Sequence, residues 1–197
     1  QNTGTISGGT FNGRVVNSNM ITNGTFNGEV VNDYGTITGG TFYGSIKDPG
    51  NKISGVIVTY KDGDSEYAKQ VLPSGTPATR PDDLAKHGYT FDGWYTEKEG
   101  ETVLWYFQSE KVTGDMTLTA HWVPAQFTVK FDYDGGTGAD GSTVESKQVT
   151  FGETYGELPI PVKEGSAFGG WEYSGQIITA DTVVQMTGEH VLTATWN

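Results

Sequence analysis

Few side chains in this chain could do chemistry, and its three histidines are the first to consider. His87, His121 and His190 do not fall at the spacings typical of metal ligands. The sequence contains no cysteine, which excludes disulfides, thiolate nucleophiles and thiolate zinc sites. A histidine metal site is the weaker alternative, and we predict that the segment holds no metal and no cofactor.

One acidic, glycine-rich stretch, DYDGGTGADG at 132–141, has the composition of a calcium-binding loop. It lacks the carboxylate spacing and the closing glutamate of an EF-hand, so we predict a hairpin turn and keep a calcium loop as the alternative. No serine lies in a G-x-S-x-G setting, and no G-x-x-x-x-G-K-S/T motif is present. The sequence therefore favours a protein without enzymatic activity.

The composition restricts both the partners and the architecture. Aspartate and glutamate total 24 against 12 lysines and arginines, a formal net charge of -12, so nucleic acid is not an expected partner. No apolar run approaches the roughly 20 residues of a spanning helix, so we expect no membrane insertion by this segment. Glycine supplies 29 of the 197 residues, which predicts short strands joined by tight turns. We expect a mainly β protein.

Three short repeats occupy residues 1–52: TISGGTFNGRVVNSN, MITNGTFNGEVVNDYG and TITGGTFYGSIKD. Within each unit a phenylalanine, a glycine, a valine or isoleucine, and an asparagine or aspartate fall at alternate positions. Alternation places these side chains on one face of a strand. The repeated positions are Phe11, Gly13, Val15 and Asn17, then Phe26, Gly28, Val30 and Asn32, then Phe42, Gly44, Ile46 and Asp48.

Stacking these units about 4.8 Å apart would place phenylalanine on phenylalanine and valine on valine. The units are therefore similar to coils of a parallel β-solenoid, and we expect residues 1–52 to form a solenoid-like segment. An antiparallel meander is the alternative. Three coils have a small core and an exposed end, so we also expect them to be the C-terminal piece of a longer array.

A longer repeat fills the rest of the chain and predicts two modules, at 53–123 and 126–197. Their alternating apolar residues give each strand one buried face. In the first copy we also expect a helical turn at 82–86. The matching segments are GYTFDGWY (88–95) with GSAFGGWEY (165–173), GDMTLTAHW (114–122) with GEHVLTATW (188–196), and VIVTYKDGD (56–64) with FTVKFDYDGG (127–136).

Further motifs accompany these repeats. The second copy carries FTVKFDYDGG, QVTFGETYGELPIPVKEG, FGGW and VLTATW, and the first carries GYTFDGWYTEKEGETVLWYF and KVTGDMTLTAHW. In this order they resemble the internalin-type B repeat, or Listeria-Bacteroides repeat, of bacterial surface proteins. The first copy departs from the pattern at VLPSGTPATRPDDLAKHG. The resemblance implies tandem β-grasp-like modules on an extracellular protein, secreted or attached to the cell surface, with no enzymatic activity.

The two copies also sort the aromatic residues, because both copies must build a core. Three pairs recur and are expected in the core: Trp94 and Trp171, Trp122 and Trp196, and Phe91 and Phe168. The run Trp105, Tyr106 and Phe107 occurs only in the first copy, where we expect it to cap the core. The expected exposed rings, and hence the candidate binding residues, are Tyr43, Tyr95, Tyr133 and Tyr155.

Two classes of function remain. The first is an adhesin or stalk segment of a bacterial cell-surface or secreted protein, with a host protein or a neutral glycan as its partner. The alternative is a carbohydrate-binding accessory region of a secreted enzyme that acts on polysaccharide. A solenoid that itself cleaves polysaccharide would need clustered charged groups. The charged residues within 1–47 are only Arg14, Glu29, Asp33 and Lys47.

Overall fold

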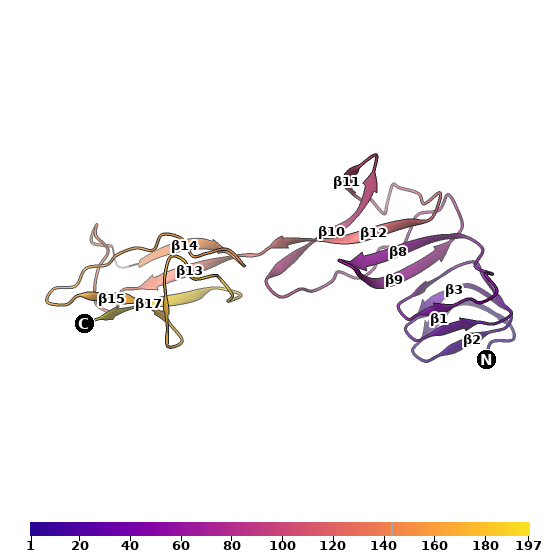
Figure 1. The fold of residues 1–197 in the computed structure, drawn as a ribbon, viewed down its shortest axis with the longest axis horizontal. Coiled ribbons are helices and arrows are strands. Elements are labelled where there is room, and N and C mark those ends of the chain that lie inside the picture. Colours follow the sequence, from indigo (N-terminus) through magenta and orange to yellow (C-terminus); the bar gives the residue numbers. More distant parts are fainter. Residues whose placement is uncertain (143) are drawn as a thin grey trace. The chain divides into compact units, whose positions relative to one another are not determined.

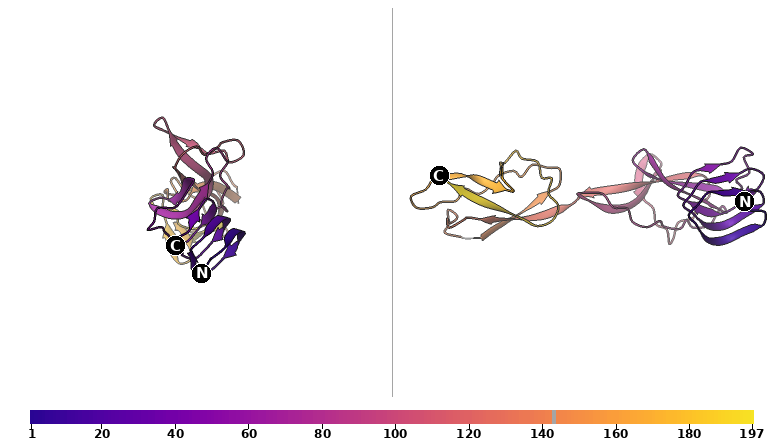
Figure 2. Two further views of the ribbon diagram at one scale, coloured as in Figure 1. Left: turned by 90° about the vertical axis from the view of Figure 1, so that its right-hand side faces the viewer. Right: turned by 90° about the horizontal axis from the view of Figure 1, so that it is seen from below.

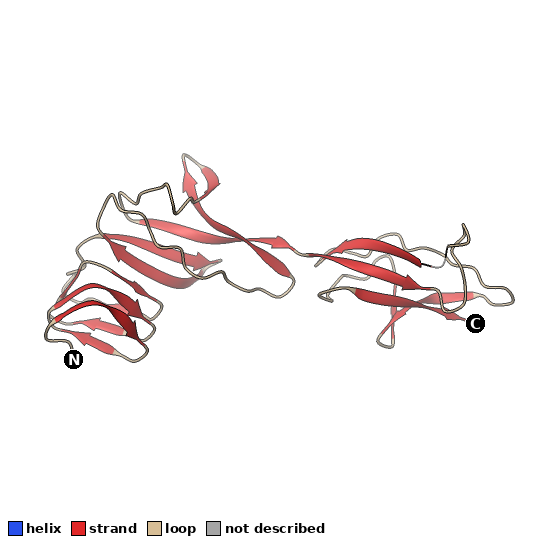
Figure 3. Ribbon diagram, turned by 180° about the vertical axis from the view of Figure 1, so that it is seen from behind, coloured by secondary structure: helices blue, strands red, loops and turns tan. Residues whose placement is uncertain are grey.

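The computed structural model describes residues 1–142 and 144–197, and the regular structure of these residues is β-strand (Figures 1 and 3). The mainly β fold expected from the composition is confirmed. None of the described residues belongs to a helix long and apolar enough to cross a bilayer. The chain divides into two compact units: Gln1–Leu84 with Asp92–His121, and Ala85–Phe91 with Trp122–Asn197.

The N-terminal strands of the first unit stack in parallel, and Figure 2 shows them as successive indigo rungs. Their bounds are β1 (Thr5–Phe11), β2 (Val15–Asn17), β3 (Met20–Phe26), β4 (Val30–Asn32), β5 (Thr36–Ile37), β6 (Gly40–Phe42) and β7 (Ile46–Lys47). β3 pairs with β1 on one side and with β5 and β6 on the other. In a second sheet, β4 lies between β2 and β7. We call these strands the N-terminal stack.

Equivalent side chains of successive repeats lie on one another in this stack. The rings of Phe11, Phe26 and Phe42 have centroids 5.0 and 4.8 Å apart and are parallel within 8°. These distances match the strand spacing of a sheet, about 4.7–4.9 Å. The predicted parallel pairing and phenylalanine stack are therefore present, and an antiparallel meander is wrong for these strands. Phe26 and Phe42 are fully buried, and each such burial contributes roughly 1.5–3 kcal/mol.

The strands of the first repeat module continue the sheet of the N-terminal stack. They are β8 (Val56–Asp62), β9 (Ser65–Leu72), β10 (Tyr89–Lys98), β11 (Glu101–Leu104) and β12 (Met116–Pro124). The order runs β6-β9-β8-β12-β10-β11, with β8 and β12 parallel and the pairs β8-β9 and β10-β11 antiparallel. β9 pairs antiparallel with β6, so Phe42 stands opposite Lys69. Val71 of β9 thereby joins the buried cluster of the stack and closes one end of its core.

The second unit repeats the strand succession of the first module. Its strands are β13 (Gln126–Asp132), β14 (Val144–Thr150), β15 (Phe168–Tyr173), β16 (Gln176–Ile178) and β17 (His190–Trp196). Their order, β14-β13-β17-β15-β16, corresponds to β9-β8-β12-β10-β11, and β13 is parallel to β17 as β8 is to β12. The predicted hairpin turn at 132–141 is confirmed, because β13 and β14 on either side of it pair antiparallel.

The recurring tryptophans divide into two kinds. Trp94 and Trp171 are fully buried, with 1% and 2% exposed, as predicted. The closing tryptophans Trp122 and Trp196 are only half-buried. The ammonium groups of Lys86 and Lys163 lie 5.5 and 5.4 Å from the centroids of their rings. The two phenylalanines predicted in the core are likewise half-buried and pack edge to face on the closing tryptophans: Phe91 on Trp122 and Phe168 on Trp196.

The helical turn predicted at 82–86 is wrong. This stretch has no helical structure, and Lys86 instead forms a bridge with Tyr89. A turn of this length has too few hydrogen bonds to offset the cost of helix nucleation. Upstream, the backbone is held by the buried Gln70, whose side-chain oxygen accepts a 2.9 Å hydrogen bond from the amide of Thr79.

Candidate functional site

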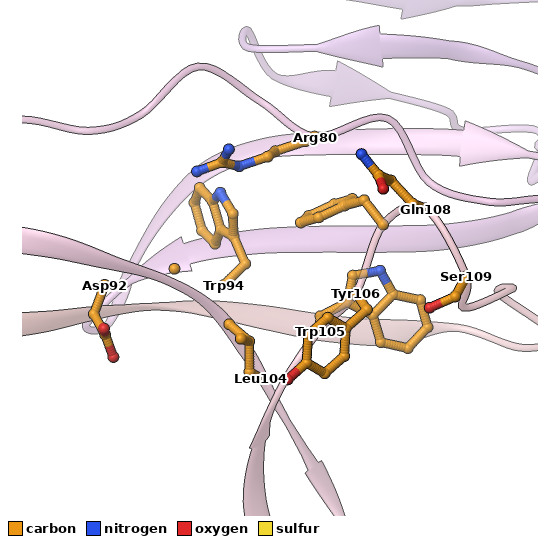
Figure 4. A pocket seen from close by; sticks show the side chains of 10 residues that line it. Arg80, Asp92, Trp94, Leu104, Trp105, Tyr106, Gln108 and Ser109 are labelled. Atoms are coloured by element: carbon orange, nitrogen blue, oxygen red, sulfur yellow. The ribbon is translucent and has the colours of Figure 1, made fainter.

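A pocket of about 400 Å³ opens on the first module beside β10 and the turn that follows β11 (Figure 4). Its volume is within the range of small-molecule sites, roughly 300–1,000 Å³. Its apolar walls are Gly93, Trp94, Leu104, Trp105, Tyr106 and Phe107. Its polar groups are Arg80, Asp92, Gln108 and Ser109. We call these ten residues the aromatic pocket.

The turn at 105–110 holds the aromatic walls in place. The amide of Trp105 donates a 2.8 Å hydrogen bond to the carbonyl of Trp94, which extends the β10-β11 pairing by one residue. The carboxylate of Glu110 accepts a 2.8 Å hydrogen bond from the amide of Tyr106 and pairs with Lys98. Partial burial raises the pKa of Glu110, but the hydrogen bonds from Lys98 and Tyr106 outweigh it, so the pKa lies below its usual value.

The two rings that begin this turn have opposite exposures. Trp105 is 6% exposed, and the ammonium of Lys98 lies 5.2 Å from the centre of its ring. Its buried indole N–H has no acceptor among the described residues. Figure 4 shows that nitrogen on the side of the ring that faces Gln108. Tyr106, the next residue, is 61% exposed, so its ring does not cap the core as predicted. Trp105 thus faces the interior, and Tyr106 faces solvent.

A hydrogen-bonded cluster lies at the Asp92 end of the pocket. One carboxylate oxygen of Asp92, Oδ2, accepts a 2.6 Å hydrogen bond from the hydroxyl of Tyr95 and lies 3.0 Å from Nδ1 of His121. The bond from Tyr95, and then that from His121, lowers the pKa of Asp92. The same bond raises the pKa of Tyr95. At neutral pH Asp92 is therefore a negatively charged hydrogen-bond acceptor at this end of the pocket.

The second module lacks both the aromatic run found at 105–107 and the hydrogen-bonded cluster of Asp92, Tyr95 and His121. Ile178 pairs with Trp171 as Trp105 pairs with Trp94, and the sequence continues Thr-Ala-Asp-Thr where the first copy has Tyr-Phe-Gln-Ser. The residues equivalent to Asp92, Tyr95 and His121 are Gly169, Glu172 and Thr195. Both modules nevertheless have the same strand order. The fold thus does not depend on the aromatic run at 105–107 or on the cluster of Asp92, Tyr95 and His121.

Of the four tyrosines predicted as exposed candidate binding residues, only Tyr95 contacts a residue of the pocket. Tyr43, 36% exposed, packs edge to face on Tyr67 at 5.5 Å. The prediction of exposure is wrong for Tyr133 and Tyr155, which are 2% and 1% exposed.

The physical reason is that segments distant in sequence cover both rings. Tyr133 packs on Trp171 with centroids 5.7 Å apart. The hydroxyl of Tyr155 lies within hydrogen-bonding distance, 2.8 Å, of Nε2 of the buried His190. Nδ1 of His190 lies 3.1 Å from the carbonyl of Gly188. Burial raises the pKa of Tyr155 to about 12.

Sequence reasoning missed Arg80, Asp92 and Gln108 as pocket residues, although Asp92 lies within the repeated motif GYTFDGWY. A usable signal was present, since the run at 105–107 occurs in one copy only, but it was assigned to the core. Chemically, the pocket offers ring faces and a few hydrogen-bonding groups. Among the side chains that the structure describes, no three histidines, aspartates or glutamates lie close enough to hold a metal ion.

The fold and the pocket define a class, a tandem β-repeat protein in which one copy carries a ligand-sized pocket. The family is shown by the sequence itself. Residues 57–121 and 127–195 both match the Listeria-Bacteroides repeat domain, and the chain belongs to this family. The resemblance stated from the motifs is thereby confirmed.

Individual relatives share part of the chain. A protein of Evansella cellulosilytica described as a Gly-rich membrane protein is 33% identical over 141 residues, covering 68% of this chain and 15% of the relative. Internalin H of Listeria monocytogenes is 32% identical over 111 residues, covering 56% of this chain and 19% of the relative. The chain thus spans less than a fifth of the length of each of these relatives.

Proposed function

We propose that this chain is a non-catalytic segment of a bacterial cell-surface or secreted protein, where it serves as an adhesive stalk. The observation that carries the proposal is the tandem pair of Listeria-Bacteroides repeats. Similarity to Internalin H and to a protein described as a Gly-rich membrane protein supports it. The partner proposed is a host protein or a neutral glycan. The net charge of -12 disfavours nucleic acid and other polyanions.

The connection between the N-terminal stack and the first module suits a stalk. β6 and β9 pair along their edges, and the side chain of Gln70 in β9 donates a 3.1 Å hydrogen bond to the hydroxyl of Thr41 in β6. The core of the stack includes Val71 of the module. A shared sheet and a shared core resist bending more than a flexible linker does. The N-terminal stack and the first module can therefore act as one body, in which the module holds the stack away from the cell.

A second candidate is a carbohydrate-binding region of a secreted polysaccharide-acting enzyme, and the aromatic pocket is the observation that favours it. The sequence of the complete polypeptide separates the two candidates. A polysaccharide-cleaving domain in the same polypeptide would favour the accessory region. A cell-wall attachment signal would favour the stalk.

The test of the surface role uses an antibody raised against this segment on intact and permeabilised cells that produce the complete protein. Labelling of intact cells, together with loss of the label after brief external protease treatment, is the expected result. Labelling confined to permeabilised cells, with none in the medium, would overturn the proposal. Turnover of a polysaccharide panel by the purified segment, abolished by one aspartate or glutamate substitution, would overturn its non-catalytic character.

A further inference from the structure

We propose that the aromatic pocket of the first module is a binding site for a neutral saccharide. The assignment rests on the proposed binding role of the segment and names the ligand class and the site. It does not depend on where the complete protein is located. The aromatic run at 105–107 and Asp92 are replaced in the second copy, which keeps the same strand order, so their presence calls for a reason other than folding.

The aromatic walls provide the apolar contact that a sugar ring needs. One face of a pyranose carries C–H groups, which pack on an aromatic ring as other apolar groups do. Tyr106 presents most of its ring to solvent, and Phe107 beside it is half-exposed. Trp94 and Leu104 form the adjoining wall (Figure 4). A flat, partly apolar ligand can therefore pack on the exposed ring of Tyr106 and the half-exposed ring of Phe107.

The polar groups of the pocket suit hydroxyls, which both donate and accept. Asp92 accepts, the amide of Gln108 does both, and the hydroxyl of Ser109 does both. The indole N–H of Trp105 is a buried donor with no acceptor among the described residues, and a ligand oxygen would satisfy it. Donors and acceptors around an apolar floor are the arrangement typical of small-molecule sites.

The charges in and near the pocket favour a neutral sugar over an acidic one. The guanidinium of Arg80 is already paired with the carboxylate of Asp83 at 2.5 Å. Asp92 is held in its ionised form by its two hydrogen bonds, so it repels a carboxylate or sulfate. The chain as a whole carries a net charge of -12. Uronic acid and sulfated units therefore meet a repulsive field.

The experiment measures binding of the whole chain to short oligomers of glucose, xylose, galactose and N-acetylglucosamine by calorimetry and saturation-transfer NMR. Galacturonic acid oligomers and a polyproline peptide are the comparison ligands. Tyr106→Ala tests the exposed ring, and Tyr34→Ala is its matched control, because Tyr34 is a 77% exposed tyrosine of the N-terminal stack. A segment exchange that places ITADT of 178–182 at 105–109 removes the aromatic turn with a sequence that the same fold accepts.

We expect at least one neutral oligomer to bind, Tyr106→Ala to weaken that binding about tenfold or more, and Tyr34→Ala to leave it unchanged. The segment exchange should abolish binding while the amide spectrum of the second module stays unaltered. Absence of binding by every neutral oligomer, or equal binding by Tyr106→Ala, would overturn the assignment. Binding of only the peptide or the acidic oligomers would also overturn it. Surface labelling of cells is a separate readout, so the proposed function and the pocket assignment can fail independently.

Discussion

The side-chain amide of Asn17 donates a 2.7 Å hydrogen bond to the side-chain oxygen of Asn32, and both residues are fully buried. The amide of Asn32 in turn donates to Asp48 at 2.8 Å and to the carbonyl of Gly35 at 3.0 Å. Successive repeats of the N-terminal stack are thus joined by a buried polar ladder. Aspartate ends this ladder, because an ionised carboxylate accepts hydrogen bonds but cannot donate one onward.

Substitution Asn32→Ala should destabilise the stack by about 1–3 kcal/mol, because it leaves a buried amide of Asn17 without its acceptor. Urea unfolding of the wild type and the variant gives this difference. Asn27→Ala is the control, since Asn27 forms an equivalent 2.7 Å bond with Asn12 on the exposed side of the stack. A change within about 0.5 kcal/mol is expected there. Equal losses for the two variants would show that burial of the ladder does not matter.

Close packing of successive repeats requires a glycine at position 28. A methyl group at this position would lie 2.6 Å from the backbone of Gly13, so Gly28→Ala must push the backbones of two successive repeats apart. Gly13→Ala is a matched control, because nothing lies within 4 Å of the corresponding position. We expect the first to lower the free energy of unfolding by about 1–3 kcal/mol. The second should change it by no more than about 0.5 kcal/mol. Thermal unfolding of the two variants measures the difference. Similar melting curves for Gly28→Ala and Gly13→Ala would contradict the prediction.

The second module depends on Trp171. Its ring is buried against Phe131, with centroids 4.8 Å apart, and its indole N–H donates to the carbonyl of Pro159 at 2.8 Å. Trp171→Ala should cost about 3–5 kcal/mol, a large share of the stability of a small domain. Calorimetry should show the transition of the second unit lowered or lost while that of the first unit is unaffected. Ile160→Ala, at a 73% exposed site of the same unit, is the control.

Acid should loosen the turn that forms the aromatic pocket. The pKa of Glu110 lies below its usual value of 4.5, so its ion pair with Lys98 stabilises the folded state above that pH. This contribution is lost as the pH falls through the folded-state pKa, because the folded carboxylate then gains a proton as the unfolded one already has. The Glu110 side chain is 23% exposed, so the contribution should stay below about 1 kcal/mol.

The measurement is the difference in unfolding free energy between the wild type and Glu110→Gln, from about pH 6 to about pH 3. Glu110→Gln should be the less stable at the higher pH, and the difference should shrink toward zero at the lower. The exposed Glu101→Gln serves as the comparison for general charge effects. A difference that is constant or grows on acidification would refute the role assigned to the ion pair.

The sequence alone determined the features that repeat. Spacing of Phe11, Phe26 and Phe42 sufficed to predict parallel stacking, because identical alternating units bury their apolar face best when they lie in register. Recurrence of Trp94 and Trp171 placed both in the core, since two copies of one fold must fill the same interior space. These are local patterns that occur more than once, so they can be recognised without coordinates.

Tertiary structure alone decided which of the remaining rings face solvent and where the pocket forms. Tyr155 lies outside any strand and is covered by His190, 35 residues away, while Tyr106 projects from a turn whose direction is set by Lys98 and Glu110. The pairing of β6 with β9 likewise joins two edges that no local pattern connects. Burial of a single side chain depends on what else packs over it, and contacts between distant segments leave no periodicity in the sequence.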